Sequence, residues 1–224
     1  MQASSVYVRG IELLLLALPV IACLSIPGPG VIAAALIVTG VLIARRDVRS
    51  VVLDLWWRGP PASVALGIAA GVSINVFVQI IVDPLIHYLL NSKAQVSALG
   101  SISGDLRGYI QLLAIGLLFG GIAEELVFRG FLIGWSTRLL GERAILPSVV
   151  LSSALFGYSH LYQGLAGVIE TAIVGLLLAI LYVKAGRRLS PSSFAHMTID
   201  AIGITDLYLN GAITEFFTRH VAWL

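Results

Sequence analysis

Two adjacent glutamates and an arginine lie inside one of the most apolar parts of this chain, in the stretch GIAEELVFRG at residues 121–130. Charged side chains are costly in apolar surroundings, so such residues are usually paired or functional. Glu125 and Arg129 are four residues apart, so on a helix they share a face and can form an ion pair. Glu124 points about 100° away from Glu125 on an α-helix and has no partner in its own helix. An unpaired carboxylate of this kind can act as a general base, whereas an ion pair can serve only to join helices.

Two later motifs place histidines at the same helical spacing. Phe156 and His160 share a helix face in FGYSH, and His196 and Asp200 share one in HMTID. The carboxylate of Asp200 can hold the imidazole of His196 in a single tautomer. A buried histidine is often only structural, so each motif alone is a weak indication of catalysis.

The composition predicts the environment of these side chains. Hydrophobic residues make up 58% of the 224 residues and charged residues only 12%, whereas soluble domains contain about 25% charged residues. The mean hydropathy is +0.96. We therefore expect an integral membrane protein. The net charge of +2, with arginines scattered in short loops, argues against nucleic-acid binding. The single cysteine, Cys23, permits no internal disulfide.

Apolar segments of suitable length predict an all-α fold, a polytopic transmembrane bundle of about seven to eight helices. The sequence PGPG at residues 27–30 predicts a tight helical hairpin between the first two segments. No polar linker or repeat divides the chain, so a single membrane domain over residues 1–224 is expected. The predicted segments are 11–26, 31–44, 62–82 with an extension toward 90, 109–130, 146–162, 164–184 and 191–211.

Basic residues cluster after three of the predicted segments and set the expected orientation. They follow the second, fourth and sixth segments, and short loops rich in lysine and arginine usually face the cytoplasm. All three connections are therefore expected on the cytoplasmic side. The clusters are Arg45, Arg46, Arg49 and Arg58; Arg129, Arg138 and Arg143; and Lys184, Arg187 and Arg188.

The three motifs, in this order and with this spacing, resemble the signature of the CPBP family (CAAX proteases and bacteriocin-processing proteins). These Abi-type intramembrane proteases include the Ras-converting CAAX prenyl endopeptidase. The family pattern is two glutamates with an arginine four residues after the second, then Phe and His four apart, then His and usually Asn four apart. The resemblance covers about residues 109–205, which we expect to be a CPBP-like catalytic core.

The resemblance implies a bundle of membrane helices around a polar cavity that opens toward the cytosol. It implies catalytic roles for Glu124, His160 and His196, with Asp200 as the fourth residue of the site. Supporting roles are expected for Glu125, Arg129 and Phe156. The implied substrate is a peptide or a lipidated, CAAX-like protein in the bilayer.

Asp200 departs from the family pattern, in which an asparagine is commoner at this position. An asparagine amide can donate a hydrogen bond to a developing oxyanion, whereas an ionised aspartate can only accept one. Three alternatives follow: Asp200 is protonated, it orients His196, or it binds a metal.

We expect hydrolysis of a peptide bond by a water molecule held between Glu124 and His160, with His196 stabilising the tetrahedral oxyanion. A zinc site made of His160, His196 and either Glu124 or Asp200 is the alternative. The sequence has no HExxH motif, and the two histidines come from different segments, so no cofactor is favoured.

The predicted segments place the three candidate catalytic residues at different depths in the bundle. Glu124 and His196 lie roughly 8 Å inside the edge of the bundle, whereas His160 lies about 20 Å deep if its segment starts at residue 146. Either that segment begins deeper, or the fourth segment continues through GFLIGW and the cavity is deep. We predict that the three side chains converge.

Other functions compete with proteolysis. A non-enzymatic membrane scaffold or a bacteriocin-immunity protein would use the bundle only as a binding surface. A proton-coupled transporter can also contain buried Glu and His, but repeated halves with broken helices are not evident. A rival pair, Asp83 and His87 across Pro84, is interpreted as a kinked helix end.

Overall fold

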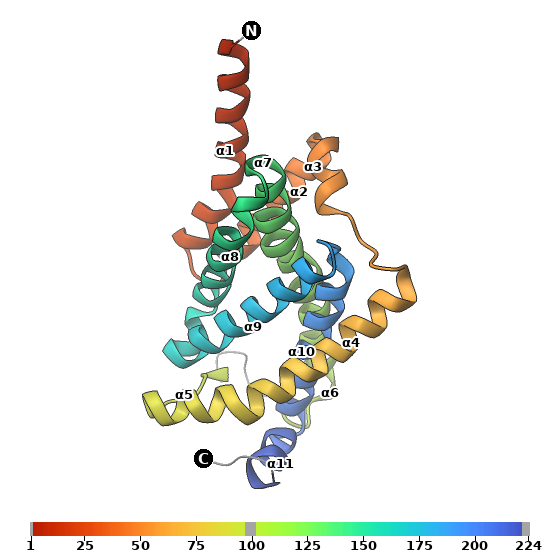
Figure 1. Ribbon diagram of the computed structural model, residues 1–224. Coiled ribbons are helices and arrows are strands. Elements are labelled where there is room, and N and C mark those ends of the chain that lie inside the picture. The colour runs from red at the N-terminus through yellow and green to blue at the C-terminus, as the bar shows by residue number, and fades with distance from the viewer. Residues whose placement is uncertain (1, 97–101, 221–224) are drawn as a thin grey trace.

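The computed structural model describes residues 2–96 and 102–220, and this part of the chain is helical, without strands (Figure 1). Three helical stretches are long and apolar enough to cross a membrane, namely Pro60–Leu90, Leu106–Leu140 and Leu161–Lys184. Gly10–Ser25 and Gly30–Ala44 are shorter apolar helices. The all-α membrane fold is thus confirmed, while the number of crossings, the single domain and the direction in which a cavity opens stay predictions.

The first two helices form the predicted hairpin. Helix α1 (Gln2–Ser25) and α2 (Gly30–Ala44) lie side by side and are joined by the turn after Ser25. Gly30 has no room for a side chain, because a Cβ there would collide with the carbonyl of Ala22 in α1. The hairpin packs through Cys23, Val31 and Val38, among other residues, against the core of the molecule.

A continuous helical stretch from Leu106 to Leu140 runs through the core. It consists of α6 (Leu106–Ile115), η3 (Gly116–Glu124), η4 (Leu126–Trp135) and α7 (Ser136–Leu140). Its middle is π-helical, a geometry with i→i+5 hydrogen bonds that is rare beyond one turn and frequent at functional sites. Every residue from 127 to 137 is buried. The fourth segment therefore continues through GFLIGW. This was one of the two explanations offered for the different depths of His160 and Glu124.

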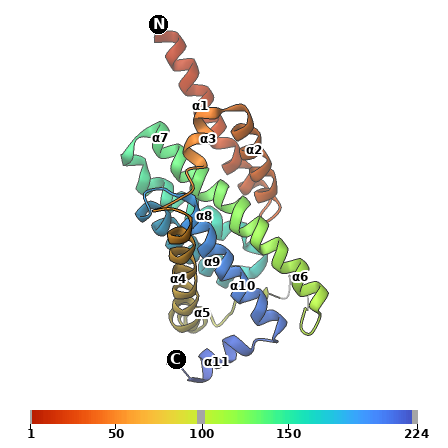
Figure 2. The same cartoon turned by 90° about the vertical axis from the view of Figure 1, so that its right-hand side faces the viewer.

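Helices α8 and α10 pack on this stretch, and α4 lies on the far side of α10 (Figure 2). Helix α10 packs between α4 and η3, and α8 packs against α9. Gly67 and Gly71 of α4 lie against the α10 backbone, where a Cβ would clash with Phe194 or Ala195. Small residues allow this close approach between membrane helices. The bounds are α4 (Pro60–Phe77), η1 (Val78–Val82), α5 (Asp83–Leu90), α8 (Ile145–Ser159), η6 (Leu161–Gln163), α9 (Gly164–Lys184), α10 (Leu189–Tyr208) and α11 (Ala212–His220).

The basic connections meet at one end of the bundle. Arg187 donates to both oxygens of Glu142, in the short helix η5 (Glu142–Ala144), at 3.0 and 2.9 Å. This bond holds the pKa of the Glu142 carboxyl below its ordinary value. Arg188 pairs with Asp54, which follows α3 (Arg46–Val52). The connections therefore lie on the same side, and their cytoplasmic location stays a prediction.

The assignment of Arg129 to one of these connections was wrong. Its side chain is fully buried within η4. The central helix extends to Leu140, so Arg129 lies in the interior of that helix. Only Arg138 and Arg143 of that predicted cluster are exposed near the end of the bundle.

Candidate active site

A fully buried ion pair lies at the centre of the site. The Arg129 guanidinium donates to Glu125 Oε1 at 2.7 Å, and neither side chain has any exposed surface. Arg129 also donates to the carbonyl oxygen of Gly175 in α9 at 3.0 Å, and its Cζ lies 4.7 Å from the centroid of the Phe156 ring. The predicted pair is therefore confirmed. It connects the central helix to α8 and α9.

The imidazole of His196 faces carboxylates with both nitrogens. Nδ1 lies 2.9 Å from Glu125 Oε1 and donates its proton to this carboxylate. Nε2 lies 3.9 Å from Glu124 Oε2 and 3.7 Å from Asp200 Oδ1. His196 is 4% exposed and Glu124 is 9% exposed. The first motif thus provides one carboxylate for each edge of the imidazole.

The sequence offered Asp200 as one possible orienting partner of His196, but the structure places Glu125 in that position. The i, i+4 spacing favoured Asp200, but Glu125 makes the hydrogen bond to Nδ1. Asp200 lies at the opposite edge, beyond hydrogen-bonding distance from Nε2. The reason is tertiary packing: the crossing of α10 over η3 brings Glu125 to the imidazole. A carboxylate that is itself held by Arg129 fixes the ring orientation more firmly than a partly exposed aspartate.

His160 follows the last turn of α8. Its Nδ1 lies 2.8 Å from the carbonyl oxygen of Phe156 and donates to it, so Nε2 is the nitrogen available for chemistry. The Phe156 ring contacts both histidines, with ring centroids 4.9 Å from His160 and 5.5 Å from His196. His160 also lies within electrostatic range of His196 and Asp200. The three motifs therefore converge, and a direct contact between His160 and Glu124 stays a prediction.

Glycines of η3 permit the close approach that forms the site. A Cβ on Gly120 would collide with Asp200 Oδ2 and lie 3.4 Å from His196 Nε2. A Cβ on Gly116 would lie 2.8 Å from Ile204 Cδ1. Our interpretation of the sequence missed both glycines. For Gly120, the available signal was its place in the pair of glycines in FGGIAEE, just before the glutamates.

The rival pair is arranged differently. Asp83 interacts with Glu170 of α9, while the side chain of His87 is exposed on α5. His87 therefore offers a control histidine for experiments on the site.

The donor atoms of the site do not meet the requirements of a zinc ion. No group of three or more His, Cys, Asp and Glu side chains within residues 2–96 and 102–220 is arranged to hold a metal ion. The Nδ1 atoms of His160 and His196 are both engaged, with a carbonyl and a carboxylate. The candidate ligands His160, His196 and Glu124 therefore do not form a zinc site in this arrangement.

The fold and site define an integral membrane protein with carboxylates and imidazoles gathered inside its helices. Residues 107–202 match the family model described as type II CAAX prenyl endopeptidase Rce1-like. The matched segment contains all three motifs, so the resemblance of this part of the chain to the CAAX protease family is confirmed. Neither the curated proteins nor the solved structures gave a match.

Proposed function

We propose that the protein is an intramembrane endopeptidase that hydrolyses a peptide bond in a membrane-associated or lipidated, CAAX-like protein or peptide. One observation carries the proposal: His196 Nε2 faces Glu124 and Asp200, while Glu125 holds its Nδ1. A buried imidazole with one fixed edge and one edge toward free carboxylates is arranged for proton transfer. The family match supports a protease.

The proposed reaction starts with a water molecule at Glu124. As general base, Glu124 takes a proton while the water oxygen forms a bond to the carbonyl carbon of the substrate. The carbonyl oxygen becomes an oxyanion. When the tetrahedral intermediate collapses, the C–N bond breaks and the proton held by Glu124 passes to the leaving amine. His160 shares this proton through its Nε2 atom, since its Nδ1 is bound to a backbone carbonyl.

His196 stabilises the oxyanion in this mechanism. When doubly protonated, it donates Nδ1–H to Glu125 and presents Nε2–H to the oxyanion. The Glu125–Arg129 pair orients the ring and supports its positive charge, as a carboxylate does in other histidine-dependent hydrolases. Asp200 then acts from the other side of Nε2 as a second negative charge that stabilises the imidazolium.

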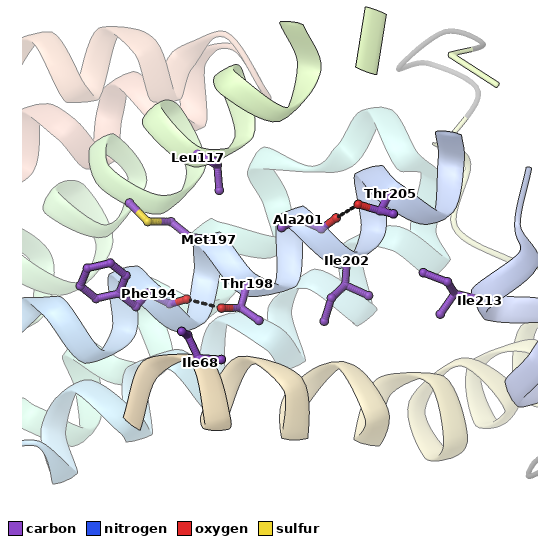
Figure 3. Close-up of a pocket in the computed structure, with 9 residues that line it drawn as sticks. All are labelled: Ile68, Leu117, Phe194, Met197, Thr198, Ala201, Ile202, Thr205 and Ile213. Atoms are coloured by element: carbon purple, nitrogen blue, oxygen red, sulfur yellow. Dashed lines mark hydrogen bonds between the residues drawn. The ribbon is translucent and has the colours of Figure 1, made fainter. Parts of the chain in front are cut away.

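An apolar groove beside the site supports a lipidated substrate. It has a volume of about 470 Å³ and lies between α4, α10 and α11 (Figure 3). Met197, Ala201 and Thr205 line it at intervals of four residues, so this face of α10 is adjacent to the face with His196. The Thr205 hydroxyl donates to the carbonyl of Ala201 at 2.6 Å and leaves the groove surface apolar. An isoprenoid or acyl chain in this groove would place the attached peptide near Glu124.

Peptide cleavage by the detergent-purified protein tests the proposal. Quenched peptides of one sequence, with and without a farnesylated C-terminal cysteine, are compared in the presence and absence of a chelator. We expect cleavage of the farnesylated peptide at least about tenfold faster, because its chain buries apolar surface in the groove, and no effect of the chelator. Equal rates would contradict the lipidated substrate. Loss of activity on chelation with rescue by zinc would contradict the metal-free mechanism. No cleavage of any peptide would favour a scaffold or an immunity protein.

A further inference from the structure

A second cavity lies at the end of the bundle where the basic connections meet. None of its lining residues belongs to the three motifs. Its volume is about 470 Å³. Its lining residues come from α1, α3 and the junction of η4 with α7. The lining residues are Glu12, Asp47, Ser50, Val51, Trp135, Arg138 and Leu139. Nothing in the proposed proteolytic reaction uses them.

One wall of this cavity carries an excess of negative charge. Arg45 donates to Glu12 Oε1 at 2.6 Å and to both oxygens of Asp47 at 3.0 and 2.7 Å. Two carboxylates thus share one guanidinium. Among the side chains that the structure describes, the second oxygen of Glu12 has no hydrogen-bond partner, and Glu12 as a whole is only 6% exposed. A buried carboxylate oxygen without a donor is costly, so this wall is suited to a ligand that brings N–H groups.

The cavity also contains unused hydrogen-bond donors. Trp135 lines the cavity and is 5% exposed, and its indole Nε1 has no hydrogen-bond partner among the described residues. Arg138 is exposed and forms no ion pair or hydrogen bond with another described residue. A guanidinium and an indole N–H together are suited to an anionic oxygen such as that of a phosphate.

The two kinds of wall are complementary to a ligand that has an ammonium group and a phosphate close together. The position of the cavity favours a lipid as the source of this ligand, because the basic ends of membrane proteins lie at the level of the headgroups. Val51 and Leu139 add apolar surface to the same cavity. The ammonium group must carry at least one N–H, because a trimethylated ammonium has no hydrogen to donate to Glu12.

We propose that this cavity binds the headgroup of an aminophospholipid of the phosphatidylethanolamine type. The ammonium group donates to Glu12 and Asp47, and the phosphate accepts from Arg138 and Trp135. Such a lipid would hold α1 and α3 against the central helix. The proposal does not depend on the proteolytic function, since no residue of the cavity belongs to the candidate active site.

Lipid binding to the intact, detergent-purified protein tests this inference. The probes are dihexanoyl phosphatidylethanolamine, dihexanoyl phosphatidylcholine and free phosphoethanolamine, and their affinities are measured by calorimetric titration. We expect phosphatidylethanolamine to bind at least about tenfold more tightly than phosphatidylcholine, because hydrogen bonds to a charged group are lost with the trimethylated amine. Free phosphoethanolamine is expected to bind more weakly than the lipid, because it lacks the apolar chains.

Variants locate the binding. Glu12→Gln and Arg138→Gln are each expected to weaken binding of phosphatidylethanolamine about tenfold. Arg143→Gln, which changes an exposed arginine at the same end outside the cavity, is expected to leave it unchanged. Arg138 is exposed, so its variant tests the site even if Glu12→Gln fails to fold. Equal affinity for the two lipids, or unchanged binding by Arg138→Gln, would overturn the proposal. Equal affinity for free phosphoethanolamine would overturn the lipid as the ligand.

Discussion

Replacing Arg129 with methionine is expected to destabilise the protein by about 3–5 kcal/mol, because it leaves the fully buried Glu125 carboxylate without the guanidinium that pairs with it. Glu125 is fully buried, and Arg129 is the only arginine among the described residues whose guanidinium contacts it. The substitution also removes the donor to the carbonyl of Gly175. Methionine preserves much of the apolar volume of the arginine stem, so the loss measures charge and hydrogen bonding more than packing. Chemical or thermal unfolding in detergent measures the effect.

A double variant separates the pair from its surroundings. Glu125→Gln combined with Arg129→Met removes both charges and is expected to recover a large part of the lost stability. Arg143→Met changes an exposed arginine and is expected to alter the unfolding free energy by no more than about 0.5 kcal/mol. If Arg129→Met unfolds like the wild type, the pair does not hold the helices together.

Replacing His196 with glutamine is expected to slow peptide cleavage by about 10²–10³-fold, the usual effect of losing one oxyanion donor. Glu125 keeps its bond to Arg129 in this variant, so the protein is expected to remain folded. The loss should fall on kcat rather than on KM, because the bond to the oxyanion exists only in the transition state. Steady-state cleavage of the preferred peptide, with unfolding as a check of the fold, gives both values.

His87→Gln is the matched control for this experiment. His87 is exposed on α5 and is paired in sequence with an aspartate at the same spacing as His196, so its replacement is expected to leave cleavage unchanged. An equal loss of activity in both variants would mean that His196 acts only through stability. Unchanged kcat in His196→Gln would remove the imidazole from the mechanism.

Local spacing in the sequence predicted the parts of this site that lie within one helix. Glu125 and Arg129 are four residues apart, and a separation of four places side chains on one face in either helical geometry found here. The ordered motifs also predicted that distant segments converge, because each contains ionisable residues that membrane helices place inside the bundle.

Spacing in the sequence did not predict the contacts between helices. The hydrogen bond from His196 to Glu125 depends on how α10 crosses η3, and that crossing is set by the absence of side chains at Gly116 and Gly120. The extent of the central helix was underestimated, because Arg129 resembled the charged end of a membrane segment. Its buried partner, rather than its position in the sequence, determines where it lies.

The central claim is that Glu124 activates the water that cleaves the peptide bond. The most direct measurement compares the rates at which wild type, Glu124→Gln and Glu142→Gln cleave the preferred peptide. Glu142→Gln is the control, because Glu142 is an exposed glutamate at the basic end. A general base contributes about 10²–10⁴-fold, so we predict a loss of that size in Glu124→Gln and wild-type activity in Glu142→Gln. If folded Glu124→Gln cleaves the peptide within about twofold of the wild-type rate, the loss is far smaller than a general base would cause. This result would contradict the claim and make Glu124 a structural charge.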